Sequence, residues 1–183
     1  PFIQGDQNLL QALADQAAVS LHFASMQEDL AAKERIDHDL HVARHIQSAL
    51  LPRAIPEFPG IEIAAHNEAA QQIGGDYYDV VPVDERHVGF AIADVSGKGI
   101  GGAIMMSVCR SVLRAEAHNH LSPAEVLRAV DRVMNEDISE DMFVSMVYMV
   151  FDRQDRTLTI ARAGHERPLV CSGEKPPRVT VLD

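Results

Sequence analysis

The chain has 183 residues, 46% of them hydrophobic, which is enough for one sizeable core and an appendage. Its 16 Lys and Arg residues against 27 Asp and Glu residues give a formal net charge of −11. This acidic balance argues against nucleic acid or an anionic membrane as the main partner.

The sequence of residues 1–51 predicts one long helix. Asp6 can cap its start, and no proline or glycine follows before Pro52. Apolar residues recur with the spacing of a heptad seam at Val19, Phe23, Met26 and Leu30. Lys33 interrupts this seam. It resumes, after a local overwinding of the helix, at Ile36, Leu40 and Ala43. A single amphipathic helix lying on its own domain is the alternative. The apolar stripe is narrow, however, and favours a parallel coiled-coil dimer.

Three prolines, Pro52, Pro56 and Pro59, end this helix. We therefore expect a domain boundary here, between a signalling or linker helix (1–51) and a folded domain (52–183). The domain is expected to open with a strand at Ile61–His66, where apolar and polar residues alternate loosely.

Two acidic motifs flank a predicted hairpin. Gly74-Gly75-Asp76 precedes it and Asp94-Val-Ser-Gly-Lys-Gly99 follows it, while Val80–Ala93 reads as two strands around a polar turn. A hairpin brings Asp76 and Asp94 side by side, where paired carboxylates suit a hard divalent cation such as Mg²⁺ or Mn²⁺. Two surface turns with solvated acids are the alternative. We favour the metal site because the apolar run before Asp94 ends directly on it.

Later segments predict two helices in succession, Gly97–Ala117 and one that starts at the capping box of Ser122, followed by strands at Met142–Phe151, Thr157–Ala163, Pro168–Cys171 and Arg178–Leu182. Two consecutive helices with strands on both sides exclude a simple alternating βαβ chain. They favour an α+β fold in which helices pack on antiparallel sheets.

A literal G-x-G-x-x-G pattern occurs at Gly97, Gly99 and Gly102. It matches the dinucleotide fingerprint, but Asp94 at the strand end would repel a pyrophosphate and a second helix follows the first. A nucleotide-hydrolase phosphate loop is also excluded, because Gly99 follows Lys98 where Ser or Thr is required. We expect these glycines to turn the backbone around a metal ion.

The 2 cysteines, Cys109 and Cys171, lie in apolar or strand-like surroundings. We expect buried free thiols in a reducing cytoplasm rather than a disulfide. No apolar run approaches the length of a membrane span. Because the chain begins in the middle of a pattern at Pro1, we expect it to be a piece of a longer protein.

The motifs GGDYYD, AIADVSGKGIGGA, MFVSMVYMVFD and ARAGHERP together resemble the PPM-type metal-dependent serine/threonine phosphatases, in the branch of SpoIIE and RsbU. ARHIQSALLP is similar to the entry linker of that branch, so the resemblance covers about Ala43–Asp183. The opening PFIQGDQNLLQALADQAAVSLHFA resembles the closing helix of a GAF sensor domain.

This resemblance implies a four-layer α-β-β-α sandwich whose C-terminal part is missing here, with two Mn²⁺ or Mg²⁺ ions at one edge. By position, Asp94 matches the carboxylate that bridges both metals, the carbonyl of Val95 a backbone ligand, and Asp76 the acid of the first motif. Asp79, the second acid of GGDYYD, is expected to cap or to orient neighbouring groups rather than to bind metal. His165 could act as a proton donor, but we favour a structural histidine between strands. Nothing matches the family's later metal-binding aspartates, so we expect this chain alone to be inactive.

The implied function is removal of phosphate from phosphoserine or phosphothreonine of an anti-sigma-factor antagonist, in a bacterial partner-switching pathway that controls a stress response. The N-terminal helix would regulate the enzyme as a homodimer in the cytoplasm. The alternative is a non-catalytic interaction module that uses the same sandwich to bind a partner protein.

Overall fold

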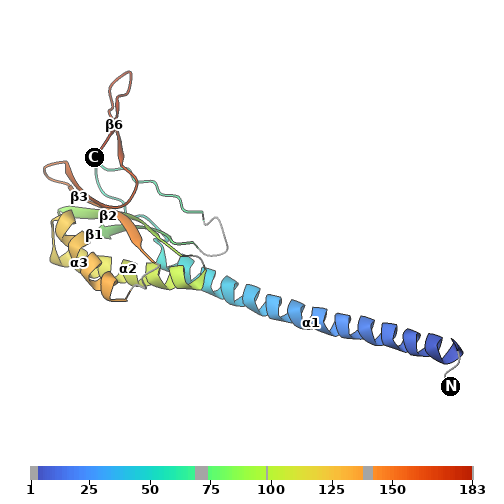
Figure 1. Ribbon diagram of the computed structural model, residues 1–183. Coiled ribbons are helices and arrows are strands. Elements are labelled where there is room, and N and C mark those ends of the chain that lie inside the picture. Colours follow the sequence, from blue (N-terminus) through green and yellow to red (C-terminus); the bar gives the residue numbers. More distant parts are fainter. Residues whose placement is uncertain (1–3, 69–73, 98, 138–141, 183) are drawn as a thin grey trace. The chain divides into compact units, whose positions relative to one another are not determined.

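The computed structural model describes residues 4–68, 74–97, 99–137 and 142–182 (Figure 1). The chain divides into two compact units, Pro1–Val42 and Ala43–Asp183. No helix among the described residues combines the length and apolarity that crossing a membrane requires. The boundary expected at Pro52 stays a prediction.

The predicted long helix is confirmed as α1, Gln4–Leu50. It begins two residues before Asp6, so the expected cap position is wrong, as often happens at helix ends, where sequence signals are weakest. The apolar residues of the predicted seam are exposed on this single chain, with Phe23 58%, Leu30 55% and Ile36 59% accessible. The coiled coil itself stays a prediction.

A four-stranded antiparallel sheet in the order β1-β2-β3-β4 organises the second unit. Its strands are β1 (Asp76–Pro82), β2 (His87–Val95), β3 (Val144–Asp152) and β4 (Thr157–Ala163). One face is covered by α2 (Ile100–Asn119) and α3 (Pro123–Asp137), as Figure 1 shows. The predicted α+β class is confirmed.

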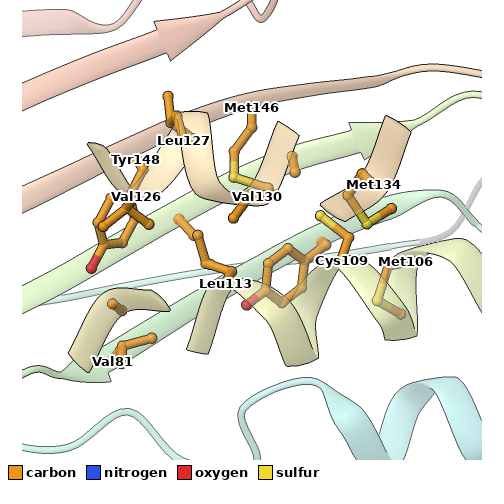
Figure 2. Packing of buried hydrophobic residues seen from close by; sticks show 14 of the residues in the cluster. Val81, Met106, Cys109, Leu113, Val126, Leu127, Val130, Met134, Met146 and Tyr148 are labelled. Carbon is orange, nitrogen blue, oxygen red and sulfur yellow. The ribbon is translucent and has the colours of Figure 1, made fainter. Parts of the chain in front are cut away.

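The core lies between this sheet and the two helices (Figure 2). Because strand side chains alternate between faces, every second residue points at the helices. The buried residues on that face include Tyr77, Ala91, Ala93, Met146 and Tyr148, and they pack against Met106, Cys109, Leu113, Val126 and Val130 of the helices. Burial raises the pKa of the Cys109 thiol to about 12.

The hairpin of β1 and β2 is stabilised by hydrogen bonds at its turn. Asp84 accepts hydrogen bonds from the backbone N–H of Arg86 and of His87, both at 2.7 Å. The Arg86 guanidinium donates in turn to Asp152 at the end of β3, with Nε at 2.7 Å from Oδ1. This contact holds the pKa of the Asp152 carboxyl well below its usual range. The turn therefore fixes the hairpin register from its closed end.

Two further expectations are wrong. The first strand, Ile61–His66, does not form: only Ile61 makes a single bridge, to Phe58. Alternation alone does not make a strand, since a strand also needs a neighbour for its backbone hydrogen bonds. Cys171 is exposed rather than buried, although both thiols are free as expected. It lies in β5 (Leu169–Cys171), which pairs with β6 (Val179–Val181) in a separate two-stranded sheet.

Candidate metal centre

The hairpin places the two predicted acids directly opposite each other. Asp76 opens β1 and pairs with Asp94 near the end of β2. Both carboxylates are exposed on the sheet face that the helices leave uncovered, because their neighbours Tyr77 and Ala93 point into the core. The sequence prediction that a hairpin brings these residues together is confirmed. That they bind metal stays a prediction.

Gly75 brings the backbone of Val95 to the same point. The Val95 N–H donates to the Gly75 carbonyl at 3.2 Å. A Cβ added at Gly75 would lie 2.0 Å from the Val95 carbonyl oxygen and 3.1 Å from Asp94 Oδ1. No side chain fits there, so glycine is required for the chain before Asp76 to pass this closely.

Ser145 and His165 stand beside this pair. Ser145 is the residue of β3 opposite Asp94, and its hydroxyl lies 3.5 Å from the Asp94 carbonyl oxygen and 2.8 Å from His165 Nδ1. His165 is half-buried, and its carbonyl accepts a bond of 2.9 Å from Arg162. The His165 imidazole thus contacts β3 through Ser145, and its structural role stays a prediction. Ser145 is not among the site residues predicted from the sequence, although a lone serine in the apolar MFVSMVYMVFD was a signal.

Asp79 points the other way, into the core. Its side chain accepts bonds from the Tyr77 hydroxyl at 2.8 Å and the Val80 N–H at 2.9 Å, and it pairs with Arg114 Nε of α2 at 2.9 Å. Burial first, and then the Asp79 charge, raise the pKa of Tyr77. Asp79 thus joins β1 to α2 and lies on the face opposite Asp76.

A cleft of about 560 Å³ borders Asp76 on the open face of the sheet. Asp76 and His165 line it together with the segment 63–68, and its floor is apolar, made by Tyr78, Phe90, Ile92 and Met149. A charged edge beside an apolar floor can admit a phosphorylated side chain with the chain that carries it.

The glycines after Asp94 form a tight turn into α2. Gly97 and Gly99 have positive φ angles of 100° and 74°. A Cβ at Gly102 would lie 2.7 Å from the Gly97 carbonyl oxygen. In the chain, α3 follows α2 before the next strand. This order argues against a dinucleotide-binding site at these glycines. Lys98 lies outside the described residues.

The donor set fits one hard divalent cation. Asp76 and Asp94 would supply carboxylate oxygens and Val95 a carbonyl, the ligand types that Mg²⁺ and Mn²⁺ prefer, and water would complete the shell. Within the part of the chain that the structure describes, no group of three or more His, Cys, Asp or Glu side chains gathers at one point. A second ion would need further carboxylates.

Comparison with known proteins decides the family. The family model of Stage II sporulation protein E (SpoIIE) matches residues 84–182, more than half of the chain. The chain belongs to the SpoIIE family. This span includes Asp94, Val95, Ser145 and His165, and begins at the hairpin turn, so Asp76 and β1 lie outside it.

Named relatives of this SpoIIE family member point to phosphatases. Phosphoserine phosphatase RsbU of Bacillus subtilis is 32% identical over 134 residues, which cover 73% of this chain and 40% of RsbU. The SiaA-PP2C domain of Pseudomonas aeruginosa is 25% identical with a TM-score of 0.66, covering 84% of this chain and 62% of that domain. The PP2C domain of SpoIIE from Bacillus subtilis shares the fold, with a TM-score of 0.50 at 13% identity. This match covers 60% of this chain and 31% of that one. The chain thus spans less than two thirds of each.

Proposed function

We propose that this SpoIIE family member is a metal-dependent protein serine/threonine phosphatase. The observation that carries the proposal is the pairing of Asp76 with Asp94 on the open face of the sheet, where Asp76 lines a cleft of about 560 Å³. The likeness to RsbU, named as a phosphoserine phosphatase, supports it. The substrate we propose is an anti-sigma-factor antagonist, in keeping with the partner-switching branch that the motifs resemble.

Each residue has a role in this proposal. Asp94 and Asp76 hold Mn²⁺ or Mg²⁺, Val95 adds its carbonyl, and Gly75 lets these groups meet. A bound divalent cation would lower the pKa of its water and stabilise charge on the phosphate. His165, held by Ser145, shapes the wall beside Asp94.

The second candidate is a non-catalytic interaction module. It is favoured by the small number of carboxylates that gather among the described residues. Hydrolysis of p-nitrophenyl phosphate by the full-length protein, with and without Mn²⁺, separates the two. Manganese-dependent turnover supports the phosphatase, and its absence supports the module.

This chain alone is expected to be inactive. Two divalent cations bring four positive charges, while Asp76 and Asp94 together supply two negative ones. Sites with so few carboxylates are weak, because dehydration of the ion is poorly offset. Titration calorimetry of the 183-residue chain with Mn²⁺ should show at most one weak site, with no turnover of a phosphopeptide. Two tight sites with steady turnover would contradict this expectation.

We also propose that α1 continues the closing helix of a GAF-like sensor domain and forms a parallel coiled-coil dimer. The exposed apolar stripe along α1, including Phe23, Met26 and Leu30, supports the dimer. Sedimentation of the chain with and without residues 1–42 should show a dimer for the longer form and a monomer for the shorter. A longer form that stays monomeric at high micromolar concentration would count against the coiled coil.

A further inference from the structure

Two arginines of α2, Arg110 and Arg114, lie on the same side of the helix, because they are one helical turn apart. Both reach the buried carboxylate of Asp79 in β1, the strand at one edge of the four-stranded sheet. Their side chains are partly buried there, with 21% of Arg110 and 38% of Arg114 exposed. This arrangement places two positive charges beside a single negative one.

The oxygens of Asp79 are already occupied by other donors. Oδ2 accepts a hydrogen bond from the Tyr77 hydroxyl at 2.8 Å, and Oδ1 accepts one from the Val80 N–H at 2.9 Å. Arg114 takes the remaining room, with Nε 2.9 Å from Oδ2 and Nη2 3.4 Å from Oδ1. A carboxylate offers about four lone-pair positions, so Asp79 has none left for Arg110.

The side chain of Arg110 makes no hydrogen bond to any residue that the structure describes. Its Nε is buried and lies 3.9 Å from Asp79 Oδ2, which is too far for a hydrogen bond. Arg114 Nε forms an ion pair with Asp79, but it is not aligned for a hydrogen bond either. Burying such donors unpaired costs free energy, so this pair of arginines favours an acceptor from outside the chain.

We propose that Arg110 and Arg114 form a binding site for an oxyanion, a carboxylate or phosphate group, on α2 beside the edge strand β1. Planar guanidinium groups match both kinds of oxyanion with paired N–H···O bonds. The ligand would supply the negative charge that Asp79 alone does not. Because Asp79 lies on the face of the sheet opposite Asp76, this site is distinct from the candidate metal centre.

The net charge of −11 repels anions at long range, so an anion needs a local positive site on this chain. At about 0.15 M salt the repulsion is largely screened beyond about 8 Å, whereas partly buried charges are screened much less. A free phosphate ion and an acidic side chain of a partner protein both carry the required chemistry. The experiment therefore uses one probe for each source.

Binding is measured on the full-length protein in EDTA, so that no metal at the Asp76–Asp94 pair holds the anion. Equilibrium dialysis with radiolabelled inorganic phosphate tests the free ion. Fluorescence anisotropy of a labelled peptide with adjacent glutamates tests a carboxylate carried by a protein. Arg110→Gln should weaken binding of the bound probe about tenfold, as the loss of a charge-assisted hydrogen bond does. Arg132→Gln is the matched control, because Arg132 is exposed on α3, and it should match the wild type.

Asp79→Asn should have the opposite effect on binding. Asn keeps the shape of Asp and an acceptor for the Val80 N–H, but it removes the charge that competes with the ligand for both arginines. We expect the affinity for the probe to rise about tenfold, even if Tm falls. A contact that serves structure alone gives no such gain.

Arg110→Lys provides a second variant should Arg110→Gln fold poorly. It keeps the positive charge but loses the planar fork, so it should also weaken binding, by a smaller factor than Arg110→Gln.

A folded wild type that binds neither probe would overturn the proposal. Equal affinity in the wild type and a folded Arg110 variant would overturn it too, as would a folded Asp79→Asn protein without a gain. Binding of phosphate alone would support a site for the free ion, and binding of the peptide alone a site for an acidic partner. None of these measurements uses catalysis, so their outcome is independent of the proposed phosphatase activity.

Discussion

Asp94→Asn in the full-length protein should lower Mn²⁺-dependent phosphatase activity by about 100-fold or more. Metal ions contribute several kcal/mol of transition-state stabilisation, and each 1.4 kcal/mol or so corresponds to tenfold in rate. Asn keeps the shape of Asp but removes the negative charge that holds the cation. Because Asp94 is exposed, folding should be almost unaffected, with a change of about 0.5 kcal/mol or less in the free energy of unfolding.

Asp131→Asn is the matched control. Asp131 is exposed on α3, on the far side of the sheet from Asp94, and accepts a bond from Asn135 at 3.1 Å. It should retain wild-type turnover and Mn²⁺ requirement. Steady-state kinetics across a Mn²⁺ series, with thermal unfolding of each variant, is the measurement. Near-normal turnover of Asp94→Asn with an unchanged Mn²⁺ requirement would contradict the assignment of Asp94 as a metal ligand.

Gly75→Ala should damage both stability and activity. The added Cβ would start 2.0 Å from the Val95 carbonyl oxygen, so the backbone of β1 or of β2 must move by more than an ångström or so to reach normal contact. Overpacking of this kind typically costs about 1–3 kcal/mol. Displacing catalytic groups by about 1 Å can lower the rate about 100-fold. We therefore expect a lower Tm together with a large loss of Mn²⁺-dependent activity.

Gly101→Ala separates this clash from a general effect of replacing glycine. Gly101 lies in the first turn of α2, exposed, and a Cβ there meets nothing within 4 Å. Alanine is the better helix former, so this variant should be as stable as the wild type or more stable by up to about 1 kcal/mol. Thermal unfolding and Mn²⁺-dependent hydrolysis measure both variants. A Gly75→Ala protein with wild-type Tm and activity would show that the segment before Asp76 adapts freely.

Gly75 also shows where the sequence was informative about the site. A glycine pair before an acid signals close approach of the backbone, and the structure finds that approach against Val95. The partner could not be named beforehand, because Val95 is brought there by strand pairing. Asp79 is a case in which the sequence was not informative. The motif GGDYYD holds two acids, and Asp76 is exposed while Asp79 is buried because they lie on opposite faces of the sheet.

The sequence by itself determined the local elements and the facing of Asp76 and Asp94. A short polar turn between two alternating strands sets hairpin register and so places Asp76 opposite Asp94, all within one continuous stretch. The helices followed in the same way from 3.6-residue periodicity and, for α3, from the Ser122-Pro123 start signal.

Tertiary structure alone decided the rest. Gln47 meets Gly74, Ser145 meets both Asp94 and His165, and Asp79 meets Arg114. The tertiary structure also left the segment Ile61–His66 without a neighbouring strand to pair with. These features depend on contacts between segments far apart in the chain, and no local preference of a residue encodes which distant group will complete its hydrogen bonds.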